Sequence, residues 1–145
     1  MPLVDLLKLL LEFAGISLIA LAGAHAVLPR LFNWKDDLEK LTPINKQIFI
    51  AHSLFIVVGI ALLGLVCLIF PMDLLQRSHL ALLASGSFFM CWLSRLLFQF
   101  GFFTAKLTDS KLQDFLMRVA GTLLWIFYTT VFGVIFFYQL RIIGG

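Results

Sequence analysis

Four apolar stretches, each between 23 and 26 residues long, occupy most of this 145-residue chain. They cover residues 3–28, 48–70, 80–103 and 115–140. A helix needs about 20 apolar residues to cross the hydrocarbon of a bilayer. Because no water reaches the hydrocarbon, each segment must satisfy its own backbone hydrogen bonds, as a helix does and a lone strand does not. The pattern predicts an all-α polytopic membrane protein, with a four-transmembrane-helix bundle forming one integral membrane domain over residues 1–145.

The composition agrees with a lipid environment. Hydrophobic residues make up 61% of the chain and charged residues 13%, and the formal net charge is +3. A soluble core of this length cannot bury so much apolar surface, so we expect the lipid bilayer to cover it. The small charge does not indicate a nucleic-acid partner. We expect the partners to lie in the membrane, as further copies in a homo-oligomer or as subunits of a larger membrane-protein complex.

The basic residues are unevenly distributed between the two sides of the membrane. Seven of them lie beside the first and third loops: Arg30, Lys35, Lys40, Lys46, Lys106, Lys111 and Arg118. Three lie on the other side: Lys8, Arg77 and Arg141. Since cytoplasmic loops carry the excess of Lys and Arg, we expect loops one and three in the cytoplasm and both termini on the outer side. Together with short loops and an uncleaved first helix, this favours a bacterial inner membrane.

The loop after the first span has an amphipathic pattern. Apolar residues recur at helical spacing over residues 31–41, as Leu31, Trp34, Leu38 and Leu41, with charged residues between them. Such a pattern is typical of a short interfacial helix on the membrane surface. An ordinary solvated connector is the alternative. Before the fourth span, Ser110 followed three residues later by Gln113 predicts a capping box at the start of that helix.

Small and polar residues predict which faces of the helices contact protein, because small side chains let membrane helices approach closely. On the first span the face consists of Glu12, Gly15, Ile19, Ala22, Gly23 and Ala26. The second span carries His52 and Gly59, and the third carries Phe88, Cys91, Arg95, Gln99 and Phe102. The fourth carries Arg118, Gly121, Thr122, Trp125, Thr129 and Phe136. We expect these stripes to form the bundle interior or an oligomer seam.

Glu12 is a candidate functional residue because a charge in hydrocarbon costs about 2.5–3.5 kcal/mol even on insertion scales. It lies near the middle of the first span. Burial favours the protonated form of a carboxyl group. One interpretation is therefore a proton-coupled transporter that uses Glu12. The other is a neutral Glu12 that is hydrogen-bonded within the bundle.

His25 and His52 lie near the cytoplasmic ends of the first two spans. Imidazole nitrogens ligate haem iron, pigment magnesium and transition metals. The chain lacks a His-x-x-x-His spacing, so a site would need both helices. A haem- or pigment-carrying subunit is one interpretation, and interfacial histidines bonded to backbone or lipid headgroups are the other. The sequence does not identify a cofactor.

Arg95, Gln99 and Arg118 suggest an anion site. Two guanidinium groups near one cytoplasmic opening attract a carboxylate, a thiolate or a lipid phosphate. Arg118 also lies in the first turns of a helix, where the dipole favours anions. The alternative is that the two arginines extend to the lipid headgroups.

The same region resembles the MAPEG superfamily of four-helix membrane proteins. Arg95, Phe98, Gly101 and Phe102 have the spacing of the Arg-x-x-Tyr-x-x-Gly-Tyr pattern in that family's third helix, with Phe at both Tyr positions. Arg118-Val119-Ala120-Gly121 is similar to the start of its fourth helix. The resemblance covers residues 88–125. It implies a trimer with a ligand site between subunits, where an arginine of this kind stabilises the glutathione thiolate.

The chain departs from that family at the start of the second helix. The Asn-x-x-Glu signature is replaced by Asn45-Lys46-Gln47-Ile48, which has no acidic residue. The missing Glu and tyrosine hydroxyls remove glutathione contacts. No complete catalytic constellation can be assembled, so we expect an accessory or structural subunit of a membrane complex rather than an enzyme. A MAPEG-like trimeric enzyme or a binder of lipids or anionic ligands is the alternative.

Overall fold

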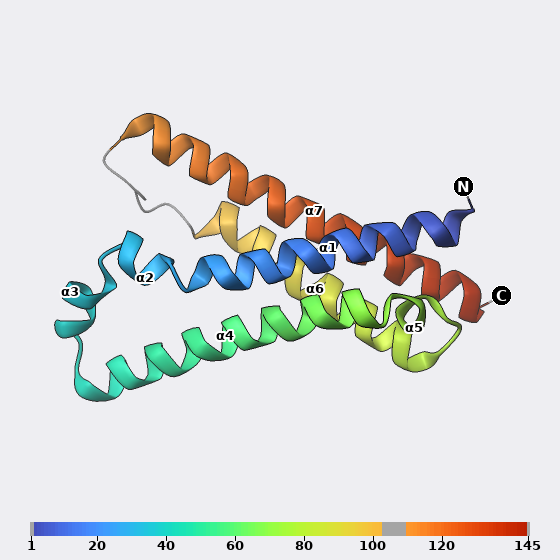
Figure 1. The fold of residues 1–145 in the computed structure, drawn as a ribbon, viewed down its shortest axis with the longest axis horizontal. Coiled ribbons are helices and arrows are strands. Elements are labelled where there is room, and N and C mark those ends of the chain that lie inside the picture. Colours follow the sequence, from blue (N-terminus) through green and yellow to red (C-terminus); the bar gives the residue numbers. More distant parts are fainter. Residues whose placement is uncertain (1, 103–109, 145) are drawn as a thin grey trace. The chain divides into compact units, whose positions relative to one another are not determined.

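The computed structural model describes residues 2–102 and 110–144, and over these residues it contains helices and no strand (Figure 1). The helices are α1 (Leu3–His25), α2 (Leu28–Leu31), α3 (Trp34–Glu39), α4 (Pro43–Ile69), α5 (Pro71–Leu75), α6 (His79–Gly101) and α7 (Lys111–Gly144). The four long helices α1, α4, α6 and α7 are long and apolar enough to cross a membrane. The predicted all-α protein with four candidate spans is confirmed. Lys106, one of the residues in the charge count, lies outside the described residues.

Prolines move the helix boundaries from where hydropathy placed them. The first helix ends at His25 rather than at residue 28, because Pro29 lies in the first turn of the next helix, α2. Helix α4 begins at Pro43, five residues before the predicted start, since a proline at the first helical position needs no backbone N–H.

Helix α7 runs for 34 residues, beyond the predicted 115–140 at both ends. Its length of about 51 Å exceeds the hydrocarbon thickness.

Loop one holds two short helices instead of the single interfacial helix predicted over residues 31–41. Helices α2 and α3 are separated at Asn33, whose φ of 50° places it in the left-handed region. Asparagine tolerates this conformation, and it interrupts helical hydrogen bonding. Trp34 packs edge-on against Phe49 of α4, with ring centres 5.1 Å apart. On the exposed side the carboxylate of Asp37 bonds Lys40 Nζ at 2.8 Å and raises the pKa of that amine.

The chain divides into two compact units. One consists of Met1–Leu10 with Met72–Gly145, and the other is Leu11–Pro71. In the second unit, α1 and α4 meet backbone to backbone at Gly15 and Gly64. A Cβ atom at Gly15 would lie 2.8 Å from the carbonyl oxygen of Gly64, so only glycine fits this crossing. Small residues at a helix contact are typical of membrane proteins.

The contact faces of α1 and α4 differ in part from the predicted stripes. On α1 the buried residues include Gly15 and Ala22, as predicted, but Gly23 is exposed, and so is Ala26 in the turn after α1. The most buried apolar positions of α1 are Leu7, Leu11, Ala14 and Leu18. On α4, His52 and Gly59 are exposed, whereas Gly64 and Cys67 are buried. Small residues predict that a helix face is able to pack against another helix. Which of the possible faces is buried depends on the side chains of the neighbouring helix.

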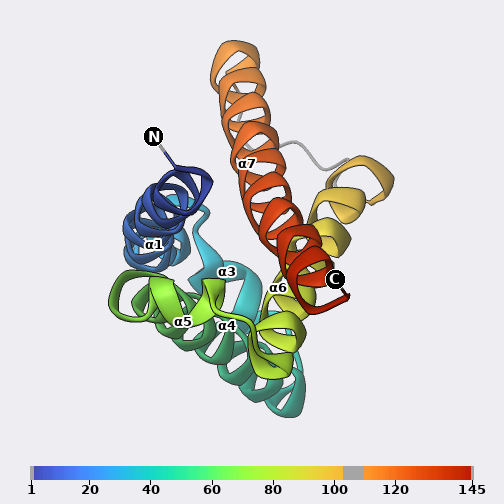
Figure 2. The same ribbon diagram turned by 90° about the vertical axis from the view of Figure 1, so that its right-hand side faces the viewer.

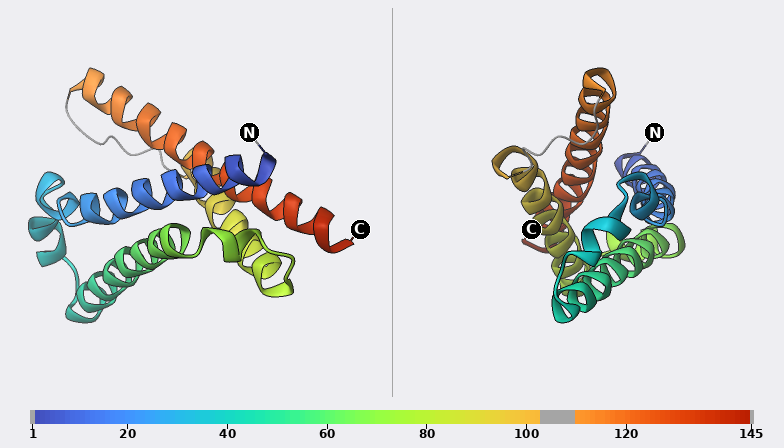
Figure 3. Two further views of the ribbon diagram at one scale, coloured as in Figure 1. Left: turned by 45° about the vertical axis from the view of Figure 1, so that its right-hand side comes forward. Right: turned by 90° about the vertical axis from the view of Figure 1, so that its left-hand side faces the viewer.

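In the first unit, α6 and α7 pack through two reciprocal contacts between a glycine and a phenylalanine. The ring of Phe136 on α7 covers Gly86 on α6, and the ring of Phe89 on α6 covers Gly133 on α7. A Cβ added at these glycines would lie 2.8 Å and 3.0 Å from the respective ring carbons. Figures 2 and 3 show the two helices diverging toward the end where α6 stops and α7 begins. The predicted face of the fourth span therefore contacts α6 through Trp125 and Phe136. The predicted face of the third span contacts α7 through Phe88 and Arg95. Cys91 and Phe102, which were predicted on the same face of the third span, are exposed instead.

A buried glutamine connects α5 to α7 within the same unit. Gln139 is fully buried, and its Nε2 donates to the carbonyl oxygen of Leu74 at 2.6 Å. Ser78 caps the start of α6, because its hydroxyl accepts a hydrogen bond from the amide of Ala81 at 3.1 Å. These two bonds satisfy backbone groups at the turn between α5 and α6, as a turn near apolar surroundings requires.

Candidate functional site

Arg95 lies at the contact between α6 and α7. Its Cζ atom is 4.5 Å from the ring centre of Trp125, so the guanidinium stacks on the indole face. Its Nη1 donates to Oε1 of Gln99, one turn along α6, at 3.2 Å. The ring quadrupole of an indole attracts a cation, and more strongly where water is excluded. The predicted neighbours Arg95 and Gln99 are thus in contact, and Trp125 from the other helix completes their surroundings.

Two tryptophans extend this arrangement into the helix contact. Trp92 is 5% exposed and stacks on Trp125, with ring centres 5.6 Å apart and an angle of 14° between the ring planes. Trp92 also contacts Tyr128 at 4.5 Å between ring centres. The Nε1 atoms of both tryptophans are buried and have no hydrogen-bond partner among the residues that the structure describes. We call Trp92, Arg95, Gln99 and Trp125 the Arg95 cluster.

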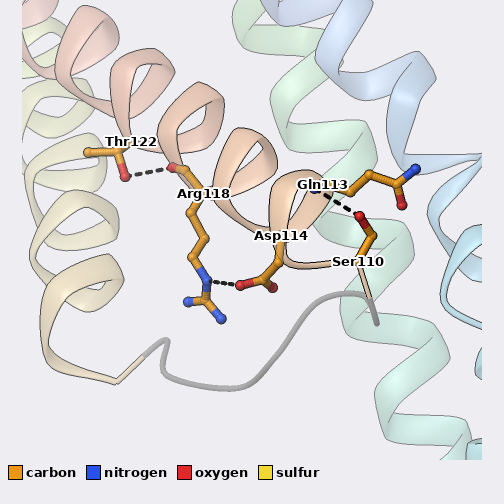
Figure 4. Close-up of polar contacts among 5 residues, drawn as sticks. All are labelled: Ser110, Gln113, Asp114, Arg118 and Thr122. Carbon is orange, nitrogen blue, oxygen red and sulfur yellow. Dashed lines mark hydrogen bonds and ion pairs between the residues drawn. The ribbon is translucent and has the colours of Figure 1, made fainter.

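Arg118 has a carboxylate partner on its own helix. Its Nε donates to Oδ2 of Asp114 at 2.9 Å, and the two side chains are 28% and 19% exposed (Figure 4). The hydroxyl of Thr122 donates to the carbonyl oxygen of Arg118 at 2.8 Å. At the start of α7, Ser110 Oγ accepts from the amide of Gln113 at 3.4 Å, which is the bond that Ser110 makes in the predicted capping box. The carboxylate of Asp114 therefore offsets the positive charge of Arg118, which was not predicted from the sequence.

Arg95 and Arg118 lie at different levels of the α6–α7 contact. Because Gly86 faces Phe136 and Phe89 faces Gly133, Arg95 lies at the level of residue 127 of α7. Arg118 is nine residues from that level, which is about 14 Å at 1.5 Å per residue. It therefore lies nearer the end where the two helices diverge (Figure 2). The structure places both arginines on one helix pair, but each has a polar partner of its own.

Glu12 is half-buried on α1. Its role in proton coupling remains a prediction.

His25 and His52 each bond to their own helix. The Nδ1 atom of His25 lies 2.8 Å from the carbonyl oxygen of Leu21, and that of His52 lies 2.8 Å from the carbonyl oxygen of Ile48. A carbonyl oxygen only accepts hydrogen bonds, so Nδ1 is the donor in both contacts. Over residues 2–102 and 110–144, no group of three or more His, Cys, Asp and Glu side chains is placed to hold a metal ion. A cofactor role for the two histidines remains a prediction.

Trp92, Trp125 and Asp114 were not assigned to the site from the sequence. Helical spacing contains a signal for two of them, since Trp92 precedes Arg95 by three residues and Asp114 precedes Arg118 by four. Residues at these spacings share a helix face. No local signal exists for the stacking of Arg95 on Trp125, because that contact depends on how α6 and α7 are aligned.

Comparison of the chain with protein families, with curated proteins and with solved structures finds no match.

Proposed function

We propose that this four-span membrane protein binds an anionic ligand at the Arg95 cluster, through a phosphate or carboxylate group that accepts hydrogen bonds. The observation that carries the proposal is the gathering of donors at one level of the α6–α7 contact. Arg95 and the two indole N–H groups lie within one stack of rings. The indole groups have no acceptor among the described residues.

The two unpaired indole N–H groups favour the binding of a ligand that supplies a hydrogen-bond acceptor. A buried N–H group without a partner costs about 1–3 kcal/mol relative to a paired one. The cluster offers few internal acceptors, since Gln99 Oε1 already accepts from Arg95. An oxygen supplied by a ligand at an indole N–H removes this cost.

The guanidinium favours oxygen anions over other ligands. Its planar fork matches two oxygens of a phosphate or carboxylate, and these charge-assisted bonds are stronger than neutral ones. The low dielectric of the surroundings strengthens the attraction further. Arg118 lies outside the Arg95 cluster and is paired with Asp114 (Figure 4), so its part in anion binding remains a prediction.

Lipid titration tests the proposal and separates its two ligand sources. Purified protein in neutral detergent is titrated with phosphatidylglycerol, phosphatidylcholine or a soluble aryl phosphate, and tryptophan fluorescence and native mass spectra are recorded. We expect the emission of Trp92 and Trp125 to change with phosphatidylglycerol, and retained lipid in the spectra. A response to the soluble phosphate alone would identify a free anion as the ligand. No response to either anion would refute the proposal.

Arg95→Gln and Arg95→Lys separate charge from shape in the same assay. Arg95→Gln should lower the apparent affinity at least tenfold, because the charged donors are lost. Arg95→Lys should lower it nearly as much, since an ammonium keeps the charge but not the planar fork. Arg141→Gln, which removes an exposed arginine at the far end of α7, is the matched control and should bind like the original protein.

The exposed face of α4 favours a second candidate function, that of an accessory subunit. Gly59 has open space above it, and His52 on the same helix is exposed. Small residues on an uncovered membrane helix suit contact with a partner helix. Gly59→Leu should then reduce the mass of the native assembly, and an unchanged assembly would argue against this function. The MAPEG resemblance, the trimer and the proton-coupled transporter remain predictions.

A further inference from the structure

An apolar groove runs along α6 on the side away from the Arg95 cluster. Seven residues line about 470 Å³ of open space, six of them on α6 and one, Phe136, on α7. Gly86 lies at its centre, with His79 at one end and Met90 at the other. Gly86 and Arg95 are nine residues apart, which places them on opposite sides of the helix at 100° per residue. The groove is therefore separate from the proposed anion site.

We infer that this groove holds one acyl chain of a membrane phospholipid. Both helices that form it are candidate membrane spans, so the medium outside the groove is hydrocarbon. Leucines at positions 82 and 83, Met90 and the ring of Phe136 form its walls. Leu83 and Met90 are largely exposed, which leaves the groove open along its side.

The length of the groove fits a linear occupant that reaches across one leaflet. From His79 to Met90, α6 advances eleven residues, which is about 16 Å. The hydrocarbon of a bilayer is about 30 Å thick, so one leaflet contributes about half of that. A single acyl chain has this length and the narrow width that a groove on one helix allows, whereas a packed partner helix is about 10 Å across.

Gly86 and Phe136 form the side of the groove that faces α7. Gly86 has no side chain, and the ring of Phe136 packs where a Cβ atom would be, 2.8 Å from Cε2. The ring of Phe136 therefore packs on the α6 backbone at Gly86 and forms the wall of the groove on the α7 side. Methionine adapts its shape to an irregular apolar neighbour such as a lipid chain. His79, at the first turn of α6, lies at the end where the phospholipid headgroup would be.

Photolabelling in lipid nanodiscs tests this inference. The full chain is reconstituted with phosphatidylcholine that carries a diazirine on one acyl chain, is irradiated, and is mapped by peptide mass spectrometry. We expect the label to concentrate on residues 79–90. Ser87→Phe, which places a ring in the groove, should reduce that labelling at least fivefold. Leu83→Phe serves as a second filling variant, and circular dichroism checks that both variants keep their helices.

Leu97→Phe is the matched control, because Leu97 is an exposed residue of α6 outside the groove. It should leave labelling of residues 79–90 unchanged. Equal labelling around Leu83 and Leu97 would overturn the inference, as would labelling that neither filling variant reduces. Retention of an isoprenoid lipid in place of the phospholipid would overturn the acyl-chain assignment. The lipid carries no net charge, so none of these outcomes depends on anion binding at Arg95.

Discussion

At the scale of single residues, the main question is how a permanent charge resides in a membrane span. Placing an arginine in hydrocarbon costs about 2.5–3.5 kcal/mol on insertion scales and more in simulations. Arg95 lies against an indole face and a side-chain amide, which together replace part of its hydration. The printed contacts of Arg95 are thus with neutral groups, whereas Arg118 binds the carboxylate of Asp114 directly.

Gly15 gives the sharpest single-residue prediction. Gly15→Ala places a Cβ atom 2.7 Å from Leu68 Cγ and 2.8 Å from the Gly64 carbonyl oxygen, and a backbone atom has little room to move. We expect a loss of about 1–3 kcal/mol of stability from overpacking, read as a lower midpoint of thermal unfolding in detergent. Gly23→Ala is the matched control, since nothing lies within 4 Å of its added methyl group. Equal midpoints for the two variants would contradict the close approach of α1 and α4.

At the scale of helices, the α6–α7 pair is held by interlocking rings and glycines. Phenylalanine rings pack over Gly86 and Gly133. Two further aromatic contacts join α6 to α7, Phe88 with Phe132 and Trp92 with Tyr128. Aromatic pairs contribute about 0.5–1.5 kcal/mol each beyond their buried area. Because these contacts fix the register of the two helices, they also place Trp125 beside Arg95.

A double-mutant cycle tests this register. Gly86→Ala should destabilise the protein by about 1–3 kcal/mol, because the methyl group meets the Phe136 ring. Phe136→Leu alone should lower the stability, because packing of the ring is lost. In the double variant the smaller leucine should relieve the clash with the methyl group added at position 86. The two substitutions should therefore show a coupling energy of about 0.5–3 kcal/mol. Gly121→Ala is the control, as its nearest neighbour is at an ordinary 3.6 Å. Additive effects of the two substitutions would show that Phe136 does not pack on Gly86.

At the scale of the whole molecule, an even number of spans places the two ends of the chain on the same side of the membrane. The structure describes four candidate spans, and the basic residues of the loops predict on which side the two ends lie. The expected arrangement has the C-terminal end of α7 on the outer side.

Reporter fusions check that arrangement. Fused after α7 and expressed in a bacterium, alkaline phosphatase should be active and green fluorescent protein should be dark. Removing positive charge from loop one by changing Lys35, Lys40 and Lys46 to Gln should weaken the preference, because positive charge favours the cytoplasmic side for a short loop. A fluorescent fusion with inactive phosphatase would reverse the orientation.

The number and type of the spans could be predicted from the sequence, because lipid makes each span satisfy its own backbone bonds and so turns a local apolar pattern into a helix. The Arg95–Gln99 contact and the Ser110 cap were also accessible, since both join residues three or four apart on one helix. The burial of Gly64, the stacking of Arg95 on Trp125 and the groove beside Phe136 were decided by tertiary structure alone. Each depends on the register between helices, and that register arises from shape complementarity among side chains distant in sequence, which no local pattern records.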